Sequence, residues 1–401
     1  MRSGNGPGVE PAEHAEDGIR VGLVYSLTGR LAETERSIHK GALLAVRQVN
    51  EAGGVRGHPL VPITADYVSD CAAAAVQVRE LVRRHGVIAC IGGYTSASRV
   101  AMLPAVHASR TLLIYPTYFE GLETDSRTFY AGAAPNQFLV DYVRWILANL
   151  GTKLYVIGSD YVYPRTLALL LRSLAIADGA DVVAERYVPL HQTDFGPNLA
   201  EIAALRPDVI VSNLVGTAST AAFYRQFHDA GHTAARLPIA ATVTSELDLK
   251  VMGPRLGAGH VMAATYFSSL RQPENQRYLE AFHAAFGPDE VTHVAQVGAY
   301  NAVWLLALAA HQADDLSVPS LREALADTRF TGNPEGWPLT THPNHYTSHP
   351  AYIGRARADG QFDILAEYPV RSPDPYPSLI IPADSRPAGH YSVTGGSDPA
   401  T

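Results

Sequence analysis

The hydrophobic positions along the first part of the chain predict alternating strands and helices. Apolar runs at 19–25, 60–65, 87–91 and 111–115 lack the strict alternation of a half-exposed strand. Segments with helical periodicity at 33–50, 72–84 and 96–107 separate them. Short apolar runs of this kind are typical of parallel strands that helices cover on both faces.

The same alternation restarts in the middle of the chain. Helices are expected at 136–150, 165–176, 198–204 and 217–230, and strands at 153–158, 182–188, 209–213, 237–241 and 260–266. Two successive α/β halves predict an α/β fold with two doubly wound parallel-sheet lobes joined by a hinge.

The last part of the chain follows a different pattern. Helices at 274–286, 294–312 and 317–326 have no strands between them, and a hairpin at 351–357 and 362–367 follows. Because such helices must cover an earlier sheet, we expect the chain to cross between the lobes more than once. The expected division is a disordered tail at 1–18, an N-terminal lobe of 19–132 plus about 268–332, a C-terminal lobe of 133–267 plus about 333–384, and a disordered tail at 385–401.

Composition and charge narrow the function. The chain has 401 residues, 47% of them apolar, and a net charge of −8 without a basic stripe, so direct nucleic-acid binding is not expected. The polar start lacks the apolar stretch of a secretory signal, and no run approaches a membrane span. This predicts either a cytoplasmic protein or one from which a leader has been removed, and the initial Met favours the first. Cys71 and Cys90 form no disulfide framework, although a single bridge between them stays open.

Enzyme and metal motifs are missing from the sequence. We find no Gly-x-Ser-x-Gly elbow, no phosphate-binding loop and no His-Glu-x-x-His, and we expect neither catalysis nor a cofactor. His342, His345 and His349 have a spacing that would place them on one helix face, but Pro343 and Pro350 favour a loop with surface histidines and no metal.

Hydroxyl-bearing residues follow the expected strands. In open parallel sheets, ligands bind beyond the carboxyl ends of the strands. Charges are few there, with Asp160, Glu246 and, slightly beyond, Glu120. Loops of this composition after the strands suit a small uncharged ligand. Ser and Thr both donate and accept hydrogen bonds, and Tyr adds an apolar ring that ends in a hydroxyl. The candidate binding residues are Tyr94, Thr95, Ser96, Tyr115, Thr117, Tyr118, Tyr161, Tyr163, Thr217 and Thr244.

Each candidate also has a simpler interpretation. Ser96 stands at the start of an expected helix and can be its cap, and the tyrosines can pack in a core or between lobes. Asp160 is expected to cap locally or to pair with a hydroxyl. Because polar loops follow five of the expected strands, the five together favour a ligand-binding role.

Several of these loops after the strands match the sequence pattern of a known protein family. The segments 93–96, 115–117, 134–137, 158–165, 215–217 and 244–246, within a likeness spanning about 19–382, resemble the amide/urea-binding branch of the type I periplasmic-binding-protein family. The likeness is strongest to cytoplasmic amide sensors that negatively regulate an aliphatic amidase operon. The resemblance implies that Tyr94 and Ser96 contact a short aliphatic amide or urea, with Tyr115 and Thr117 beside them. It also implies that Tyr161 closes from the second lobe with Tyr163 and Thr217 or Thr244 nearby. Tyr118 replaces a proline of the sensors and is expected to reshape the pocket.

The resemblance leads to one main expectation for function. The chain would sense an amide and control amide- or nitrile-degrading genes through an RNA-binding antitermination regulator, and a homodimer is compatible with the family. The alternative is the substrate-binding receptor of a urea or short-chain amide ABC transporter. A hydrolase that uses Ser96 or Asp160 is a third hypothesis, from the enzyme class.

Overall fold

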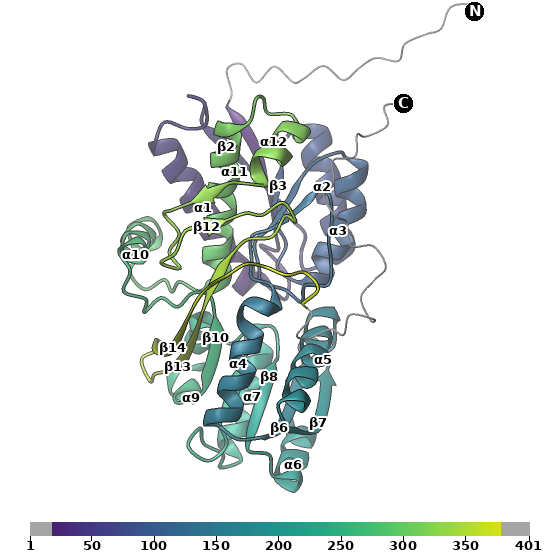
Figure 1. Cartoon of the computed structure of the whole chain (residues 1–401), viewed down its shortest axis with the longest axis vertical. Coiled ribbons are helices and arrows are strands. Elements are labelled where there is room, and N and C mark those ends of the chain that lie inside the picture. The colour runs from purple at the N-terminus through teal and green to yellow at the C-terminus, as the bar shows by residue number, and fades with distance from the viewer. Residues whose placement is uncertain (1–17, 378–401) are drawn as a thin grey trace, which may run out of the picture.

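The computed structural model describes residues 18–377 and consists of two α/β lobes stacked end to end (Figure 1). Each lobe has its own sheet, of five strands in the N-terminal lobe and seven in the C-terminal lobe. The expected α/β fold with two parallel-sheet lobes is confirmed. Residues 1–17 and 378–401, where the two tails were expected, lie outside the described residues.

The N-terminal lobe has a wholly parallel sheet in the order β2-β1-β3-β4-β5. Residues of its central strands are almost completely buried, which explains why the sequence shows apolar runs without alternation. The elements are β1 (Ile19–Tyr25), α1 (Ala32–Glu51), β2 (Leu60–Asp66), α2 (Cys71–His85), β3 (Cys90–Gly92), α3 (Ser96–Ala108), β4 (Leu113–Tyr115) and β5 (Thr128–Tyr130).

Three later helices return to this lobe: α10 (Pro273–Phe286), α11 (Val294–Gln312) and α12 (Val318–Leu325). Helix α11 packs along α1 and also contacts β3 and β4. It is apolar on all sides and long enough to cross a membrane, but 83% of its most apolar window is buried, so it is the central helix of this lobe. A Cβ atom on Gly298 would stand 2.1 Å from the carbonyl oxygen of Pro116, so glycine lets α11 support the loop after β4 directly.

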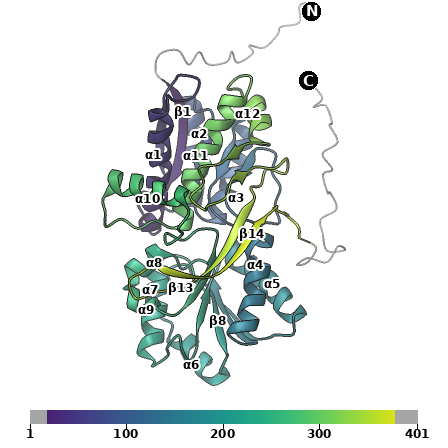
Figure 2. The ribbon, with the colours of Figure 1, turned by 60° about the vertical axis from the view of Figure 1, so that its left-hand side comes forward.

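The C-terminal lobe has a mixed sheet in the order β14-β13-β10-β9-β8-β6-β7. The late hairpin of β13 and β14 extends this sheet (Figure 2), and β13 pairs antiparallel with both β10 and β14. The elements are α4 (Pro135–Asn149), β6 (Lys153–Ser159), α5 (Val162–Ala177), β7 (Asp181–Val188), α6 (Gly196–Leu205), β8 (Val209–Asn213), α7 (Thr217–Asp229), β9 (Ile239–Ala241), α8 (Glu246–Met252), α9 (Pro254–Gly257), β10 (Val261–Ala264), β13 (His349–Ala356) and β14 (Phe362–Arg371).

The chain passes between the lobes three times, before α4, after β10 and before β13. The third passage lies later than the expected residue 333. The small strands β11 (Arg329–Phe330) and β12 (Leu339–Thr340) pair with each other, and Tyr346 forms a parallel bridge with Tyr130 at the edge of the first sheet. Residues up to 346 therefore stay beside the N-terminal lobe.

A buried polar network joins the segments that pass between the lobes. Glu335 accepts a hydrogen bond from the Thr265 hydroxyl at 2.8 Å and lies 2.8 Å from Nδ1 of His349. The other ring nitrogen of His349 lies 2.8 Å from the hydroxyl of Thr347, which donates to the Tyr130 carbonyl. His349 is 1% exposed, so the expectation of surface histidines is wrong for this residue.

The structure also shows the surroundings of the other histidines and of the cysteines, and two short elements that were not predicted. His342 and His345 are hydrogen-bonded to neighbouring residues, and the described part of the chain holds no cluster suited to a metal ion. Cys71 and Cys90 are both free thiols, which closes the question of a bridge. The short strand β5 and helix α8 were not expected from the hydrophobic pattern.

Candidate functional site

A small cavity lies where the carboxyl ends of strands from both sheets meet. The volume open to the centre of a water-sized sphere is about 20 Å³, enough for one water or the core of a very small molecule. Its walls carry phenol rings, hydroxyls and two aliphatic side chains, but no charged side chain. The lining residues are Tyr94, Ser96, Tyr115, Thr117, Tyr118, Tyr161, Tyr163, Val215 and Val243.

The turn after β3 places the first two of these residues. Gly92 and Gly93 have φ angles of +145° and +80°, and a Cβ atom on Gly92 would stand 2.1 Å from the carbonyl oxygen of Val24. Only glycine fits this approach to β1. Thr95 then caps α3, since its hydroxyl accepts from the N–H of Ser98 at 3.1 Å. Ser96 is the first residue of the helix and not its cap.

Three hydroxyl protons of the N-terminal lobe wall are already used within the protein. The Tyr115 hydroxyl donates to the carbonyl of Tyr94 at 2.7 Å, and the Thr117 hydroxyl donates to the same carbonyl at 3.1 Å. The Ser96 hydroxyl donates to Oε2 of Glu120 at 2.5 Å. Since each hydroxyl has a single proton, these three oxygens present lone pairs to any further partner.

A buried ionic cluster lies directly behind Ser96. Arg99 is 1% exposed and donates to Glu120 at 2.8 Å and to Glu123 at 3.0 Å. Burial pulls the pKa of Arg99 down, but the two carboxylates outweigh burial and raise it. The guanidinium also packs against the rings of Tyr115 and Phe119, 5.0 and 4.6 Å from their centroids. Arg99 is thus paired on the protein side and turns no free charge toward the cavity.

The C-terminal lobe supplies the opposite wall. Tyr161 and Tyr163 lie at the start of α5, and α5 contacts α3 across the two lobes. The Ser159 hydroxyl accepts from the N–H of Val215 at 2.9 Å, which fixes the loop after β8. The Tyr163 hydroxyl is buried and makes no hydrogen bond within 3.5 Å to the described residues. Burial raises the pKa of Tyr163, and the nearby Thr242 hydroxyl opposes this effect in part.

Tyr118 connects the two walls. It belongs to the loop after β4, yet its ring lies edge-on to Tyr163 at 6.2 Å and to Phe138 of α4 at 6.3 Å between centroids. Aromatic pairs at such distances attract each other by about 0.5–1.5 kcal/mol beyond the area that they bury. The large side chain at this position therefore narrows the cavity and ties the lobes together.

The cavity is neutral near pH 7. Burial raises the pKa of Tyr94, Tyr118 and Tyr161 well above the usual value, even though part of each ring remains accessible. Burial likewise raises the pKa of Tyr115 to about 12, against the lowering effect of Arg99. A charged ligand would leave water for a site without an opposite charge, which costs several kcal/mol.

Seven of the ten residues proposed from the sequence line this cavity, and three lie elsewhere. Thr95 caps α3, Thr217 begins α7 after Gly216, and Thr244 is buried on the turn before α8. Sequence reasoning missed Val215 and Val243, which stand two and one positions before these threonines. Asp160 points to the surface, where it pairs with Arg165 at 2.5 Å.

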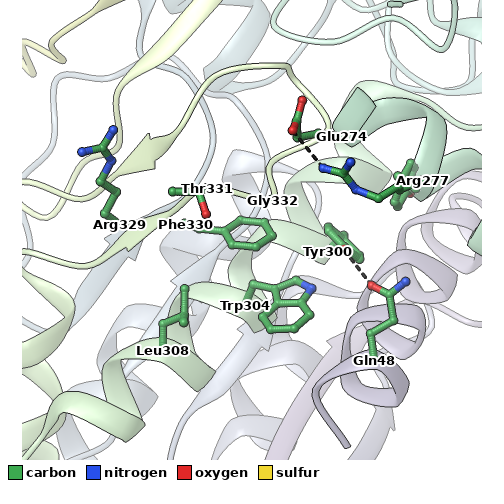
Figure 3. A pocket seen from close by; sticks show the side chains of 11 residues that line it. Gln48, Glu274, Arg277, Tyr300, Trp304, Leu308, Arg329, Phe330, Thr331 and Gly332 are labelled. Carbon is green, nitrogen blue, oxygen red and sulfur yellow. Dashed lines mark hydrogen bonds and ion pairs between the residues drawn. The ribbon is translucent and has the colours of Figure 1, made fainter. Parts of the chain in front are cut away.

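A wider hollow lies on the outside of the N-terminal lobe, between α1, α10, α11 and β11, with a volume of about 430 Å³ (Figure 3). Trp304 and Phe330 stack in parallel at 5.4 Å, and Arg277 pairs with Glu274 at its rim. The hollow belongs to one lobe and lies away from the strand ends. Its polar lining includes Gln48, Arg329 and Thr331 besides the pair of Glu274 and Arg277.

Comparison with known proteins identifies the class. Residues 19–381 match the family model described as "Periplasmic binding protein domain". A solute-binding protein of an ABC transporter from Rhodopseudomonas palustris HaA2, in complex with p-hydroxybenzoic acid, superposes with a TM-score of 0.81 at 22% identity, covering 89% of this chain and 98% of that chain. The substrate-binding protein LivJ from Streptococcus pneumoniae, in complex with isoleucine, gives a TM-score of 0.76 at 21% identity, covering 89% of this chain and 100% of that chain.

Curated relatives match over part of their length. An amino acid binding protein of Pseudomonas aeruginosa is 25% identical over 287 residues, 70% of this chain and 75% of that protein. The chain spans only 58% of Leu/Ile/Val-binding protein homolog 3 of Brucella melitensis, at 26% identity over 53% of this chain. It spans 22% of a limonene hydroxylase of Geobacillus stearothermophilus, at 30% identity over 30% of this chain.

The two lobes and the cavity between them define a binding protein of the type I periplasmic class. The chain belongs to the periplasmic binding protein family, since the family model covers most of its length.

Proposed function

We propose that this protein binds a short, uncharged amide or urea in the cavity between its lobes. The observation that carries the proposal is the lining itself: seven hydroxyl-bearing side chains and two valines surround about 20 Å³ without a charged group. The amino group of the ligand would meet the lone pairs of Ser96, Tyr115 and Thr117. The unpartnered hydroxyl of Tyr163 would donate to its carbonyl oxygen, and Val215 and Val243 suit a short alkyl group.

The size of the ligand limits its affinity. At a ceiling of roughly 1.5 kcal/mol per non-hydrogen atom, a molecule of about four such atoms gains about 6 kcal/mol. This corresponds to a dissociation constant on the order of tens of micromolar. Contacts from both lobes are needed to approach that ceiling, which explains why the residues come from both sheets.

Calorimetric titration tests the proposal. We expect heat and a rise in melting temperature with acetamide, propionamide, butyramide or urea, and none with acetate, isoleucine or p-hydroxybenzoate. Ser96→Ala should weaken binding, whereas Thr217→Ala, outside the cavity, should leave it unchanged. Absence of any effect from all four neutral compounds, or tight binding of isoleucine, would remove the proposal.

The comparisons favour a role in uptake. Relatives with solved structures are described as solute-binding proteins of ABC transporters, so the first candidate role is the receptor of a urea or short-chain amide transporter. Neighbouring permease genes and a processed, lipid-anchored N-terminus on the native protein would support it.

Gene regulation is the second candidate role. It is favoured by the strand-end segments shared with amide sensors, above all residues 158–165, and by the neutral lining of the cavity. In this role the protein would be cytoplasmic and would hold an RNA-binding antitermination regulator in an amide-dependent complex. Copurification of such a regulator, with release by acetamide, is the expected result. A native protein found only outside the cytoplasm would exclude this role.

A further inference from the structure

We infer that Glu120 is a positioning residue that makes the cavity select ligands with N–H groups, because it fixes the proton of Ser96. This inference rests on the proposed function and adds the residue that sets the preference of the cavity for amides and urea. Glu120 does not line the cavity itself; it is 4% exposed and stands behind Ser96.

The direction of the Ser96 proton follows from its neighbours. Oε1 of Glu120 accepts from Nη2 of Arg99 at 2.8 Å, and Oε2 faces the Ser96 hydroxyl at 2.5 Å. A guanidinium has no acceptor and keeps its charge, and a carboxylate paired with it has no proton to give. Ser96 must therefore donate to Glu120, and its lone pairs face the cavity.

Two further hydroxyls of this wall also turn their protons away from the cavity and their lone pairs toward it. Tyr115 and Thr117 both direct their protons to the carbonyl of Tyr94, which can only accept. The N-terminal lobe wall thus presents three accepting oxygens. The NH₂ group of an amide or urea would pair with them, whereas the methyl group of a ketone or the second oxygen of an ester at the same place has no proton to donate and would leave these lone pairs unpaired.

Glu120→Gln should reverse the polarity at Ser96 alone. Because Nη2 of Arg99 can only donate, the new amide oxygen would face Arg99 and the new NH₂ group would face Ser96. Ser96 would then accept on the protein side and turn its proton into the cavity, against the N–H of the ligand. Two opposed donors in a buried site should weaken binding by roughly 5- to 150-fold.

The test compares acetamide with acetone, which keeps the carbonyl group and replaces NH₂ by methyl. We expect the wild type to prefer acetamide at least tenfold, and Glu120→Gln to lose that preference mainly through weaker acetamide binding. Glu123→Gln removes a similar charge from Arg99 without contacting Ser96, and it should keep the preference. In a Ser96→Ala background, Glu120→Gln should have no further effect on the preference.

The outcomes separate this inference from the proposed function. If the wild type binds acetamide and acetone equally well, or if folded Glu120→Gln keeps the wild-type preference, the role of Glu120 is overturned while amide binding stands. If Glu123→Gln loses the preference to the same extent, the effect is one of charge and the role of Glu120 also fails. If the wild type binds neither acetamide nor urea, both proposals fail. Where Glu120→Gln does not fold, Ser96→Ala takes its place, since Glu120 acts through the Ser96 hydroxyl: loss of the acetamide preference supports the role of Glu120, and a kept preference overturns it.

Discussion

Replacing Tyr163 by phenylalanine should change stability and ligand affinity in opposite directions. Its hydroxyl is buried and has no hydrogen-bond partner within 3.5 Å among residues 18–377, and the side chain is 3% exposed. An unpaired buried hydroxyl costs about 1–3 kcal/mol, of which the interaction with Thr242 returns a part. Tyr163→Phe should therefore be between about 0 and 2 kcal/mol more stable than the wild type in urea unfolding. A ligand that accepts from this hydroxyl recovers the same 1–3 kcal/mol, so the variant should bind acetamide roughly 5- to 150-fold more weakly.

The matched control is Tyr142→Phe. Tyr142 is equally buried, but its hydroxyl donates to the carbonyl of Val261 at 3.3 Å inside the C-terminal lobe. This variant should lose about 1 kcal/mol of stability and keep its affinity. If Tyr163→Phe instead loses more than about 1 kcal/mol and binds acetamide normally, the hydroxyl is satisfied within the protein, and the assignment of Tyr163 as the donor to the ligand is refuted.

Three further predictions concern other parts of the molecule. Tyr118→Ala should widen the cavity, so that butyramide gains affinity relative to acetamide in competition titrations; an unchanged order would show that this ring does not limit ligand size. Burial raises the pKa of Glu35 from about 4.5 to about 7, so its contribution to stability is complete below pH 4.5 and is lost as the pH rises to 7. Glu35→Gln should thus be roughly 2–3 kcal/mol more stable than the wild type at pH 8 and show a shallower pH dependence in urea unfolding between pH 5 and 7; equal slopes would contradict this. Glu335→Ala leaves buried His349 and Thr265 without their shared partner and should cost about 3–5 kcal/mol in the same assay, with a smaller loss for Glu335→Gln; a loss below 1 kcal/mol would mean that water replaces the carboxylate.

The sequence predicts the meeting of Ser96, Tyr115 and Tyr161 because it predicts the strands before them. Carboxyl ends of parallel strands meet at one edge of each sheet, and the two edges face each other across the hinge. It could not decide which side chain of each loop turns inward. Val215 and Val243 line the cavity while Thr217 and Thr244 do not, since the backbone of a turn changes direction at every residue.

Long-range pairing explains the other differences. Tyr346 bridges to Tyr130, more than two hundred residues away, and this contact keeps the segment before β13 with the first lobe. No local pattern announces such a pairing. The prediction of a surface histidine at position 349 is wrong because its partner Glu335 lies 14 residues earlier, beyond β12, where no helical or strand spacing relates the two residues.

The contact of Tyr118 with Tyr163 also bears on the concentration range in which this protein would bind its ligand. Because these two rings attract each other, part of the free energy that keeps the lobes closed comes from the protein itself and does not have to come from the small ligand. The apparent dissociation constant equals the intrinsic one divided by the fraction of molecules already in the binding-competent form. If Tyr118 raises the fraction of ligand-free molecules in the binding-competent form, it lowers the ligand concentration at half-saturation. The same contact then sets how much of the protein is in that form when no ligand is present.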